Sequence, residues 1–261
     1  FALYVTFVPQ LVAGPIVRAK DLITQFYEPK KASQNQFIWG LFLLTLGLFQ
    51  KVVLADVLLA GTSDSVFSPG QTLSFLDAWT GTLAFSGQIF FDFAGYSTCA
   101  IGIALMLGII LPDNFMYPYA SLGFSDLWKR WHISLSSWLK DYLYIPLGGN
   151  RHGITRMYAA LMITMLLGGL WHGAAWTFIV WGGLHGIYLI LERLQKQYLP
   201  FKITKWNGIF LAFTTFTCVH ITWVFFRARE FETAWSMIKS MFFLNPEGAK
   251  ILTTFQMIQV L

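Results

Sequence analysis

The sequence contains no Asp, Glu, Lys or Arg between Met157 and Leu184, and this charge-free run strongly constrains the fold. A helix crosses the hydrocarbon core of a bilayer with about 20 mostly apolar residues, so the run is long enough to form membrane-embedded helices. The whole chain is 56% hydrophobic and 12% charged. Soluble domains average about 25% charged residues, so the sequence predicts a polytopic membrane protein.

The apolar runs predict an all-α fold. The predicted membrane segments are residues 37–61, 75–111, 158–170, 174–191 and 208–226. Residues 75–111 fit either one strongly tilted helix or two shorter segments, and residues 1–17 are ambiguous because Pro9, Gly14 and Pro15 interrupt them. The chain starts without Met inside one apolar stretch and stops inside another. We expect one membrane-embedded domain, residues 1–261, that is incomplete at both ends.

The net charge is +5, with an isoelectric point of about 9.2. The basic residues cluster between the apolar runs, as the positive-inside bias produces, and this predicts a bilayer partner rather than nucleic acid. Residues 112–156 carry five of the 18 Lys and Arg residues and are expected at the cytoplasmic interface. Cys99 and Cys218 lie in apolar runs without CxxC spacing and are expected to be small core residues.

The segment 112–156 mixes charges with large aromatic residues. In helical phase one broad face carries Leu127, Trp131, Leu135, Trp138 and Tyr142. This pattern predicts an interfacial or re-entrant amphipathic helix. Pro146 is expected to end the helix, and Gly148-Gly149-Asn150 to form a turn.

The chain has five histidines, at positions 132, 152, 172, 185 and 220. No HExxH motif or close pair occurs, so no metal site is expected. His172 stands in the charge-free run, where polar ionisable groups are functional candidates. Two interpretations remain open from the pattern: a general base, or a buried histidine satisfied by a neighbouring carbonyl. Gly168, Gly169 and Gly173 would let another backbone or a ligand approach closely.

His132 and Asp92 each allow two interpretations. His132 follows Trp131 and is either an interfacial side chain between Trp anchors or a functional group. Asp92 is the only charge between Asp77 and Asp113, and it fits structural pairing or a proton relay. The GxSxG and GxxxxGK[ST] motifs are absent, so neither a serine-hydrolase elbow nor a phosphate loop is supported. Direct transfer to an acceptor hydroxyl is therefore favoured over a covalent intermediate.

Four stretches together resemble the membrane-bound O-acyltransferase family, within its bacterial branch that acylates extracytoplasmic glycans. The stretches are FVPQLVAGPIVRA, FFDFAGYSTCAIG, FSDLWKRWHISLSSWLKDYLYIPLGGNR and LLGGLWHGAAWTFIVWGGLHG, in that order, with FFRA at 225–228 extending the match. The resemblance implies a multi-helix bundle with a tunnel through it. The family's catalytic histidine falls on His172 and its second polar position on His132.

The resembling motifs also supply the expected substrate-binding residues, which are Trp131, Asp92, Asn150, Arg151 and Trp171. His132 is expected to orient or stabilise the donor's acyl carbonyl. The chain departs from the pattern after Tyr96, where many relatives read Ser-Asp and this sequence reads Ser97-Thr98. A role for that acid therefore does not carry over.

The resemblance implies transfer of an acyl group, in the first place acetyl, to hydroxyls of an extracytoplasmic polysaccharide such as alginate. The donor would be acetyl-CoA or an acyl-carrier thioester used as co-substrate, with no tightly bound cofactor. Further expectations are an inner (cytoplasmic) membrane location and soluble acyl-carrier or periplasmic acetyltransferase partners. Two alternatives stay open: D-alanyl transfer to teichoic acid, and a proton-coupled transporter, which would show matched halves that the sequence lacks.

Overall fold

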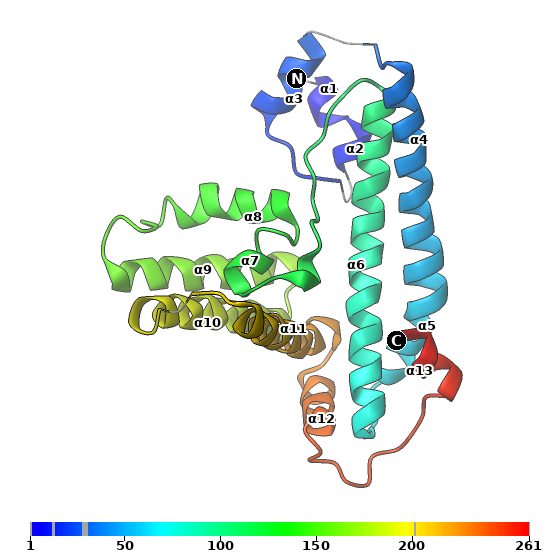
Figure 1. The fold of residues 1–261 in the computed structure, drawn as a ribbon, viewed down its shortest axis with the longest axis vertical. Helices are drawn as coiled ribbons and strands as arrows, with labels where there is room; N and C mark the ends of the chain where they lie inside the picture. Colours follow the sequence, from blue (N-terminus) through cyan, green and yellow to red (C-terminus); the bar gives the residue numbers. More distant parts are fainter. Residues whose placement is uncertain (1, 12–13, 28–30, 201, 261) are drawn as a thin grey trace.

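The computed structural model describes residues 2–11, 14–27, 31–200 and 202–260, and every regular element in these ranges is helical (Figure 1). An isolated bridge between Leu73 and Ala249 is the only β-type pairing found in the described ranges. The all-α prediction is confirmed. The helices are α1 Ala2–Val5, α2 Val8–Leu11, α3 Ala19–Tyr27, α4 Gln34–Leu48, η1 Phe49–Leu59, α5 Ala60–Val66, α6 Phe75–Met106, η2 Pro118–Ala120, α7 Phe124–Leu127, α8 Ile133–Leu139, η3 Lys140–Tyr144, α9 Ile154–His172, α10 Trp176–Tyr198, α11 Lys205–Arg227, α12 Phe231–Met241 and α13 Thr254–Val260.

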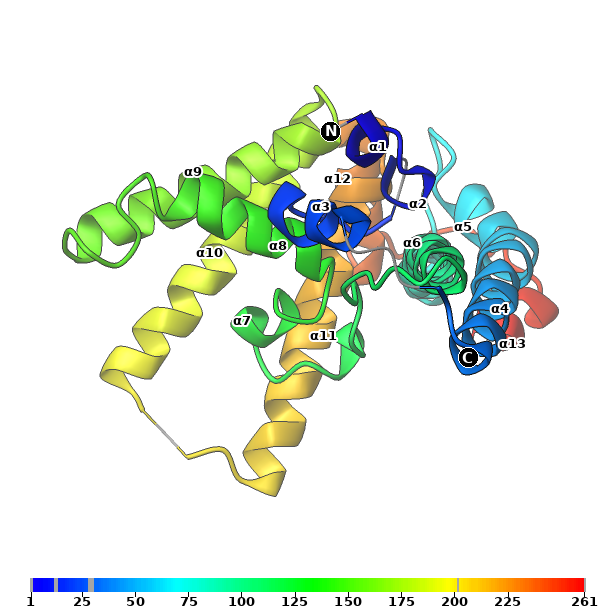
Figure 2. The ribbon, with the colours of Figure 1, turned by 90° about the horizontal axis from the view of Figure 1, so that it is seen from above.

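Two long helices lie side by side over most of their length (Figures 1 and 2). One is the continuous rod Gln34–Val66, formed by α4, η1 and α5, and the other is α6. Gly47 and Gly95 meet at their crossing, where a Cβ on Gly47 would come 2.6 Å from the Gly95 carbonyl oxygen. The predicted segment 75–111 is thus a single helix that ends at Met106.

The middle of the first rod is the π-helix η1. Five residues turn an α-helix through about 500°, so residues i and i+5 would point in different directions there. The i to i+5 hydrogen bonds of a π-helix stack them instead. Lys51 and Asp56 consequently share a face, with 2.9 Å between Lys51 Nζ and Asp56 Oδ1.

The second group of helices, α9, α10 and α11, runs crosswise to the α4–α6 pair (Figures 1 and 2). Close packing of α9 on α10 depends on glycine. A Cβ on Gly169 would lie 2.3 Å from the Phe178 carbonyl oxygen, and one on Gly182 would lie 2.4 Å from the Met165 carbonyl oxygen. The sequence suggested that Gly169 allows either another backbone or a ligand to approach closely. In the structure, the backbone of α10 occupies this position.

Within the described residues, four helices are long and apolar enough to cross a membrane: Gln34–Val66, Phe75–Met106, Ile154–His172 and Lys205–Arg227. The predicted segment 174–191 does form a helix, α10, but this helix is not among the four. It continues to Tyr198 through Glu192, Arg193 and Lys196, which make its C-terminal part polar. Residues 1–17, as far as they are described, contain only the short helices α1 and α2, and Val12 and Ala13 of the first resembling motif lie outside the described residues.

The single amphipathic helix predicted between Pro112 and Pro146 is wrong. The chain forms α7, then leaves helical geometry, and resumes as α8 after His132, which has φ 44° and ψ 56°. This left-handed conformation is uncommon outside glycine. Gly148 and Gly149 do form the predicted turn, with φ of 119° and 50°.

The largest core cluster of the described residues joins α6, α7, α10, α11 and α12, and many of its members are aromatic. Trp181 and Trp223 are 2% and 3% exposed and stack with 6.1 Å between ring centroids. Trp223 also contacts Phe85 edge to face. This aromatic core links the crosswise helices to α6, and both sequence-predicted histidines border it.

Candidate active site

His172 is the last residue of α9, where the helix stops before Gly173. Its ring is surrounded by aromatic side chains, with centroid distances of 5.0 Å to Trp171, 5.2 Å to Trp181 and 4.9 Å to Phe226. No hydrogen bond joins either ring nitrogen to the part of the chain that the structure describes. The interpretation as a carbonyl-satisfied core histidine therefore lacks its required partner.

His220 and His185 show how core histidines are hydrogen-bonded in this fold, each through one ring nitrogen. His220 Nδ1 lies 2.6 Å from the Phe216 carbonyl oxygen on its own helix. His185 Nε2 lies 3.1 Å from the hydroxyl of Thr222, whose own proton goes to the Val219 carbonyl. Both side chains are 1% exposed. His172 differs from them because its polar atoms remain available to a substrate.

His132 lies at the break between α7 and α8, and its side chain is buried rather than interfacial. The residue is 3% exposed, which contradicts the interpretation as an interfacial anchor. The edge of Phe93 meets its ring at 4.5 Å, and Phe115 packs at 6.4 Å. The left-handed backbone directs the imidazole into the protein, whereas a continuous helix would have placed it on another face.

Trp171 links the two histidines. Its ring centroid is 6.4 Å from that of His132 and 5.0 Å from that of His172. Trp171 is 61% exposed, so this side of the pair is open. The structure thus brings together three of the residues expected from the sequence.

The pKa of His132 is lowered to about 3, chiefly by burial and further by the charge of His172. His172 is the only titratable group in the described ranges whose charge acts on it in this way. The imidazole of His132 is therefore neutral at physiological pH.

Asn114 holds His132 and was not expected from the sequence. Its Oδ1 lies 3.1 Å from His132 Nδ1, and its backbone carbonyl accepts from Ile133 N at 2.9 Å. Asn114 itself is 1% exposed. It follows a Pro-Asp pair in a segment without secondary structure, and no local pattern marks it.

Trp131, which was expected to bind substrate, lies in the aromatic core. It is 7% exposed, and its ring packs 5.0 Å from Trp223 and 5.2 Å from Phe115. It therefore packs behind Phe115, which in turn contacts the His132 ring. No polar contact of its indole is recorded within the described ranges.

Asp92 is paired away from the histidines. Its Oδ1 lies 2.6 Å from Lys51 Nζ, at the seam between η1 and α6. The next residue, Phe93, is the one that contacts His132. The structure supplies the partner that the sequence left open, and that partner favours the structural interpretation of Asp92.

Asn150 and Arg151 lie in the exposed turn before α9. The Asn150 Oδ1 atom accepts hydrogen bonds from Tyr144 Oη at 2.5 Å and from Arg193 Nη1 at 3.2 Å. His172 ends α9, which begins at Ile154, so this turn is about 27 Å away along the helix. These two residues do not join the histidine pair.

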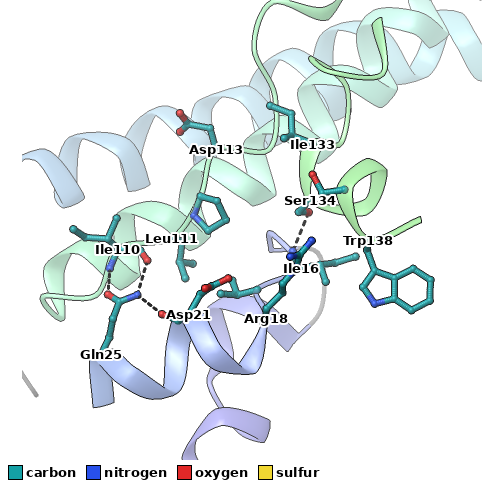
Figure 3. Close-up of a pocket in the computed structure, with 13 residues that line it drawn as sticks. Ile16, Arg18, Asp21, Gln25, Ile110, Leu111, Asp113, Ile133, Ser134 and Trp138 are labelled. Carbon is teal, nitrogen blue, oxygen red and sulfur yellow. Dashed lines mark hydrogen bonds between the residues drawn. The ribbon is translucent and has the colours of Figure 1, made fainter. Parts of the chain in front are cut away.

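A cavity of about 440 Å³ opens beside α8, between α3 and the chain that follows α6 (Figure 3). Arg18, Asp21 and Asp113 supply its charges, and Ser134 and Trp138 line the α8 side. The Ser134 hydroxyl accepts the Ile16 backbone N–H at 2.9 Å (Figure 3). Ser134 also contacts Asn114, so the cavity adjoins the support of His132.

No group of three or more His, Cys, Asp or Glu side chains that could hold a metal ion is found in the described ranges. The available chemistry is that of imidazole nitrogens in an apolar, aromatic surrounding. A neutral imidazole accepts a proton from a hydroxyl. The fold and the site together define a polytopic helical membrane protein with two adjacent imidazoles at an apolar centre.

Residues 1–228 match the membrane-bound O-acyltransferase (MBOAT) family, and the chain belongs to that family. The matched range contains α1 to α11 and both histidines of the site. The resemblance drawn from the four sequence motifs is confirmed.

The chain is similar to the peptidoglycan O-acetyltransferase of Helicobacter pylori, with 45% identity over 257 residues, covering 94% of this chain and 47% of that protein. It is also similar to the "Probable alginate O-acetylase AlgI" of Pseudomonas aeruginosa, with 45% identity over 243 residues, covering 93% and 45%. The teichoic acid D-alanyltransferase of Streptococcus thermophilus is 28% identical over 254 residues, covering 87% and 60%. The chain spans about half the length of the first two relatives.

Proposed function

We propose that this chain carries the reaction centre of a membrane O-acetyltransferase that esterifies hydroxyls of an extracytoplasmic glycan. The observation that carries the proposal is the placement of His172, which ends an apolar helix beside His132 without a hydrogen-bond partner in the described ranges. Relatives named as O-acetyltransferases or O-acetylases, at 45% identity, support acetyl as the group transferred.

In the proposed reaction His172 is the general base. The acceptor hydroxyl oxygen attacks the carbonyl carbon of an acetyl thioester while a ring nitrogen of His172 takes the hydroxyl proton. The carbon–sulfur bond breaks, the new ester forms, and the thiolate leaves with the proton from the imidazolium. Acetyl-CoA or an acyl-carrier thioester supplies the acetyl group, so the step needs no resident cofactor.

The proposal includes a vectorial arrangement. The donor would arrive from the cytoplasm and the acceptor from outside, through the tunnel that the family resemblance implies. The two would meet at His172 within the inner membrane. Soluble acyl-carrier proteins or periplasmic acetyltransferases remain the proposed partners.

The testing experiment replaces His172 by Gln in the whole protein, expressed in its native membrane. Glutamine keeps a hydrogen-bonding side chain but takes no proton at neutral pH. General-base catalysis contributes about 10²- to 10⁴-fold, so ester formation should fall to near background at unchanged membrane abundance. His152→Gln is the matched control, because His152 lies exposed in a turn. Retention of more than about a tenth of wild-type activity in His172→Gln would exclude the base assignment.

The same assay separates the alternatives. Mild base hydrolyses the glycan esters and releases the acyl group for identification. The released group is acetate under the proposed function and D-alanine under the teichoic-acid alternative, which the 28% identical relative represents. A proton-coupled transporter would form neither ester. It would instead show substrate-dependent proton flux that Asp92→Asn abolishes.

A further inference from the structure

The Nε2 atom of His132 is buried and has no hydrogen-bond partner in the described ranges. Most buried polar atoms in proteins are paired, so an unpaired one calls for a physical explanation. The other ring nitrogen, Nδ1, lies 3.1 Å from Asn114 Oδ1. Which of the two nitrogens carries the proton follows from the atoms around Asn114.

The Asn114 amide can be oriented from its backbone neighbour. The Ser134 backbone N lies 3.2 Å from the atom assigned as Asn114 Oδ1, and a backbone N–H can only donate. That atom is therefore the carbonyl oxygen. The amide nitrogen Nδ2 faces the other way and donates to Ser97 Oγ at 3.0 Å.

The Ser134 hydroxyl strengthens this orientation. It accepts the Ile16 backbone N–H at 2.9 Å, which leaves its own proton for Asn114 Oδ1, also at 2.9 Å. Asn114 Oδ1 thus receives hydrogens from every partner around it. The facing nitrogen of His132, Nδ1, must also donate, so in the neutral ring the hydrogen is on Nδ1 and Nε2 is bare.

We propose that Asn114 is a positioning residue that fixes this tautomer, so that His132 presents a bare Nε2 to the reaction centre as a hydrogen-bond acceptor. The inference rests on the proposed function of the site. It changes the sequence-based expectation for His132, because a bare nitrogen cannot donate a hydrogen bond to an acyl carbonyl oxygen. His132 instead accepts a hydrogen bond, from a hydroxyl or an N–H group at the centre.

The backbone around the pair is built to hold this geometry. Ile133 N donates to the Asn114 carbonyl at 2.9 Å, and Met116 N donates to the Arg130 carbonyl at 2.9 Å. These bonds fasten the segment after α6 to the break before α8. The left-handed conformation of His132 costs about 1–3 kcal/mol and persists only where such surrounding contacts impose it.

Phe93 and Phe115 limit rotation of the ring. Phe93 meets it edge-on at an interplanar angle of 86°, and Phe115 lies at 23° to it. A 180° rotation of the imidazole about its Cβ–Cγ bond would turn the Cδ2 carbon toward Asn114 in place of Nδ1 and lose the hydrogen bond. The hydrogen bond at Nδ1 and the packing of the two phenyl rings therefore favour the same orientation of the imidazole.

The experiment compares two replacements of Asn114 in the whole protein. Asn114→Leu removes the acceptor at similar size, so the His132 proton is no longer confined to Nδ1. Asn114→Asp keeps an acceptor for Ser134 and for His132 Nδ1 but removes the Nδ2 donor, so Ser97 can pair with it only by donating its own hydroxyl proton. Ser97→Ala is the matched control, because it removes the hydrogen bond between Ser97 and Asn114 and leaves the contact with His132 intact.

We expect Asn114→Leu to lower kcat by about 10-fold or more, up to the roughly 10⁴-fold known for a wrong tautomer in a serine-protease triad. Asn114→Asp should retain more activity than Asn114→Leu, and Ser97→Ala should stay near wild type. The added carboxylate favours the protonated imidazole, so the acid limb of the kcat–pH profile should move to higher pH in Asn114→Asp. Equal losses in both Asn114 variants, with an unshifted pH profile, would indicate a purely structural role and overturn the inference.

A second measurement does not depend on turnover or on the survival of the Leu variant. In protein labelled with ¹⁵N in its histidine rings, the signals lost in His132→Gln identify His132. The inference expects a protonated Nδ1 and a bare Nε2 at neutral pH, and the opposite tautomer would refute it. If His172→Gln is inactive while Asn114→Leu is fully active, the positioning role fails and the proposed function stands. If His172→Gln is active, the proposed function fails, and the ring signals still decide the tautomer.

Discussion

Lys51 and Asp92 form an ion pair between two apolar helices, with 2.6 Å between Nζ and Oδ1. The same Lys51 Nζ lies 2.9 Å from Asp56 Oδ1, so one ammonium serves two carboxylates. A lone charge at the centre of a membrane helix costs about 2.5–3.5 kcal/mol on insertion scales. Lys51 should therefore contribute more to stability than either Asp56 or Asp92, because it is the cation that both carboxylates share.

Replacing Lys51 by Met should destabilise the protein more than replacing Asp92 by Asn. The first change leaves two carboxylates without their cation, whereas the second leaves Lys51 paired with Asp56. We expect a loss of up to about 2.5–3.5 kcal/mol in the free energy of unfolding for Lys51→Met and a smaller loss for Asp92→Asn. Chemical unfolding in detergent and membrane abundance measure both. A larger loss for Asp92→Asn would contradict the shared-cation arrangement, and lost activity per molecule would restore the relay interpretation of Asp92.

Gly169→Ala should disrupt the packing of α9 on α10. The added Cβ would lie 2.3 Å from the Phe178 carbonyl oxygen, so the helices must move apart, and this displaces His172 from Trp181. Overpacking of this kind costs about 1–3 kcal/mol. Gly183→Ala is the control on the same helix pair, because its Cβ would meet Leu166 at an ordinary 3.6 Å. Thermal unfolding and ester formation should both decline in Gly169→Ala alone, and equal behaviour of the two variants would show that the crossing does not need Gly169.

His132 should make stability fall as the pH falls. Its pKa is lowered from the ordinary 6.5 to about 3 in the folded protein, chiefly by burial. The unfolded chain therefore binds a proton below pH 6.5 that the folded chain refuses, and stability from this residue is lost as pH decreases from about 6.5 toward 3. The slope approaches about 1.4 kcal/mol per pH unit. Unfolding of wild type and His132→Asn between pH 7 and 5 tests this, and parallel curves would rule out a neutral, buried His132.

The exposed residues of segment 112–156 should lie at the cytoplasmic interface. Single cysteines in place of Lys140 or Arg151, in a chain with Cys99 and Cys218 replaced by Ala, provide exposed reporters. A membrane-impermeant thiol reagent should leave them unmodified in sealed cells and label them after permeabilisation. Labelling from outside in sealed cells would reverse the orientation, and with it the side from which the donor is proposed to enter.

The apolar runs of the sequence determined the helices. Backbone polar groups in hydrocarbon must be satisfied within their own segment, so a long charge-free run has few options other than a helix. Residues 37–61 and 208–226 consequently became Gln34–Val66 and Lys205–Arg227. The isolation of His172 in such a run also makes it a functional candidate from the sequence alone, but the pattern fits a general base and a satisfied core histidine equally.

Only the tertiary structure decided where His132 points. The local pattern of Leu127, Trp131 and Leu135 fits one continuous amphipathic helix. Such a pattern does not reveal contacts with a distant segment of the chain. The chain breaks at His132 because the segment holding Asn114 and Met116 forms backbone hydrogen bonds there. A left-handed histidine is unfavourable by itself and becomes favourable through those bonds.

The partners of single polar residues were equally hidden in the sequence. Asp92 finds Lys51 only because glycines let α4 and α6 approach closely and because η1 changes the helical phase. Asn114 takes its orientation from Ser134 on α8 and also donates to Ser97 on α6, and the fold brings both serines to one side chain. The sequence determines which segments are helical, because an apolar segment in a membrane must pair its backbone polar groups within itself. The hydrogen-bond partners of single side chains depend instead on how the helices pack.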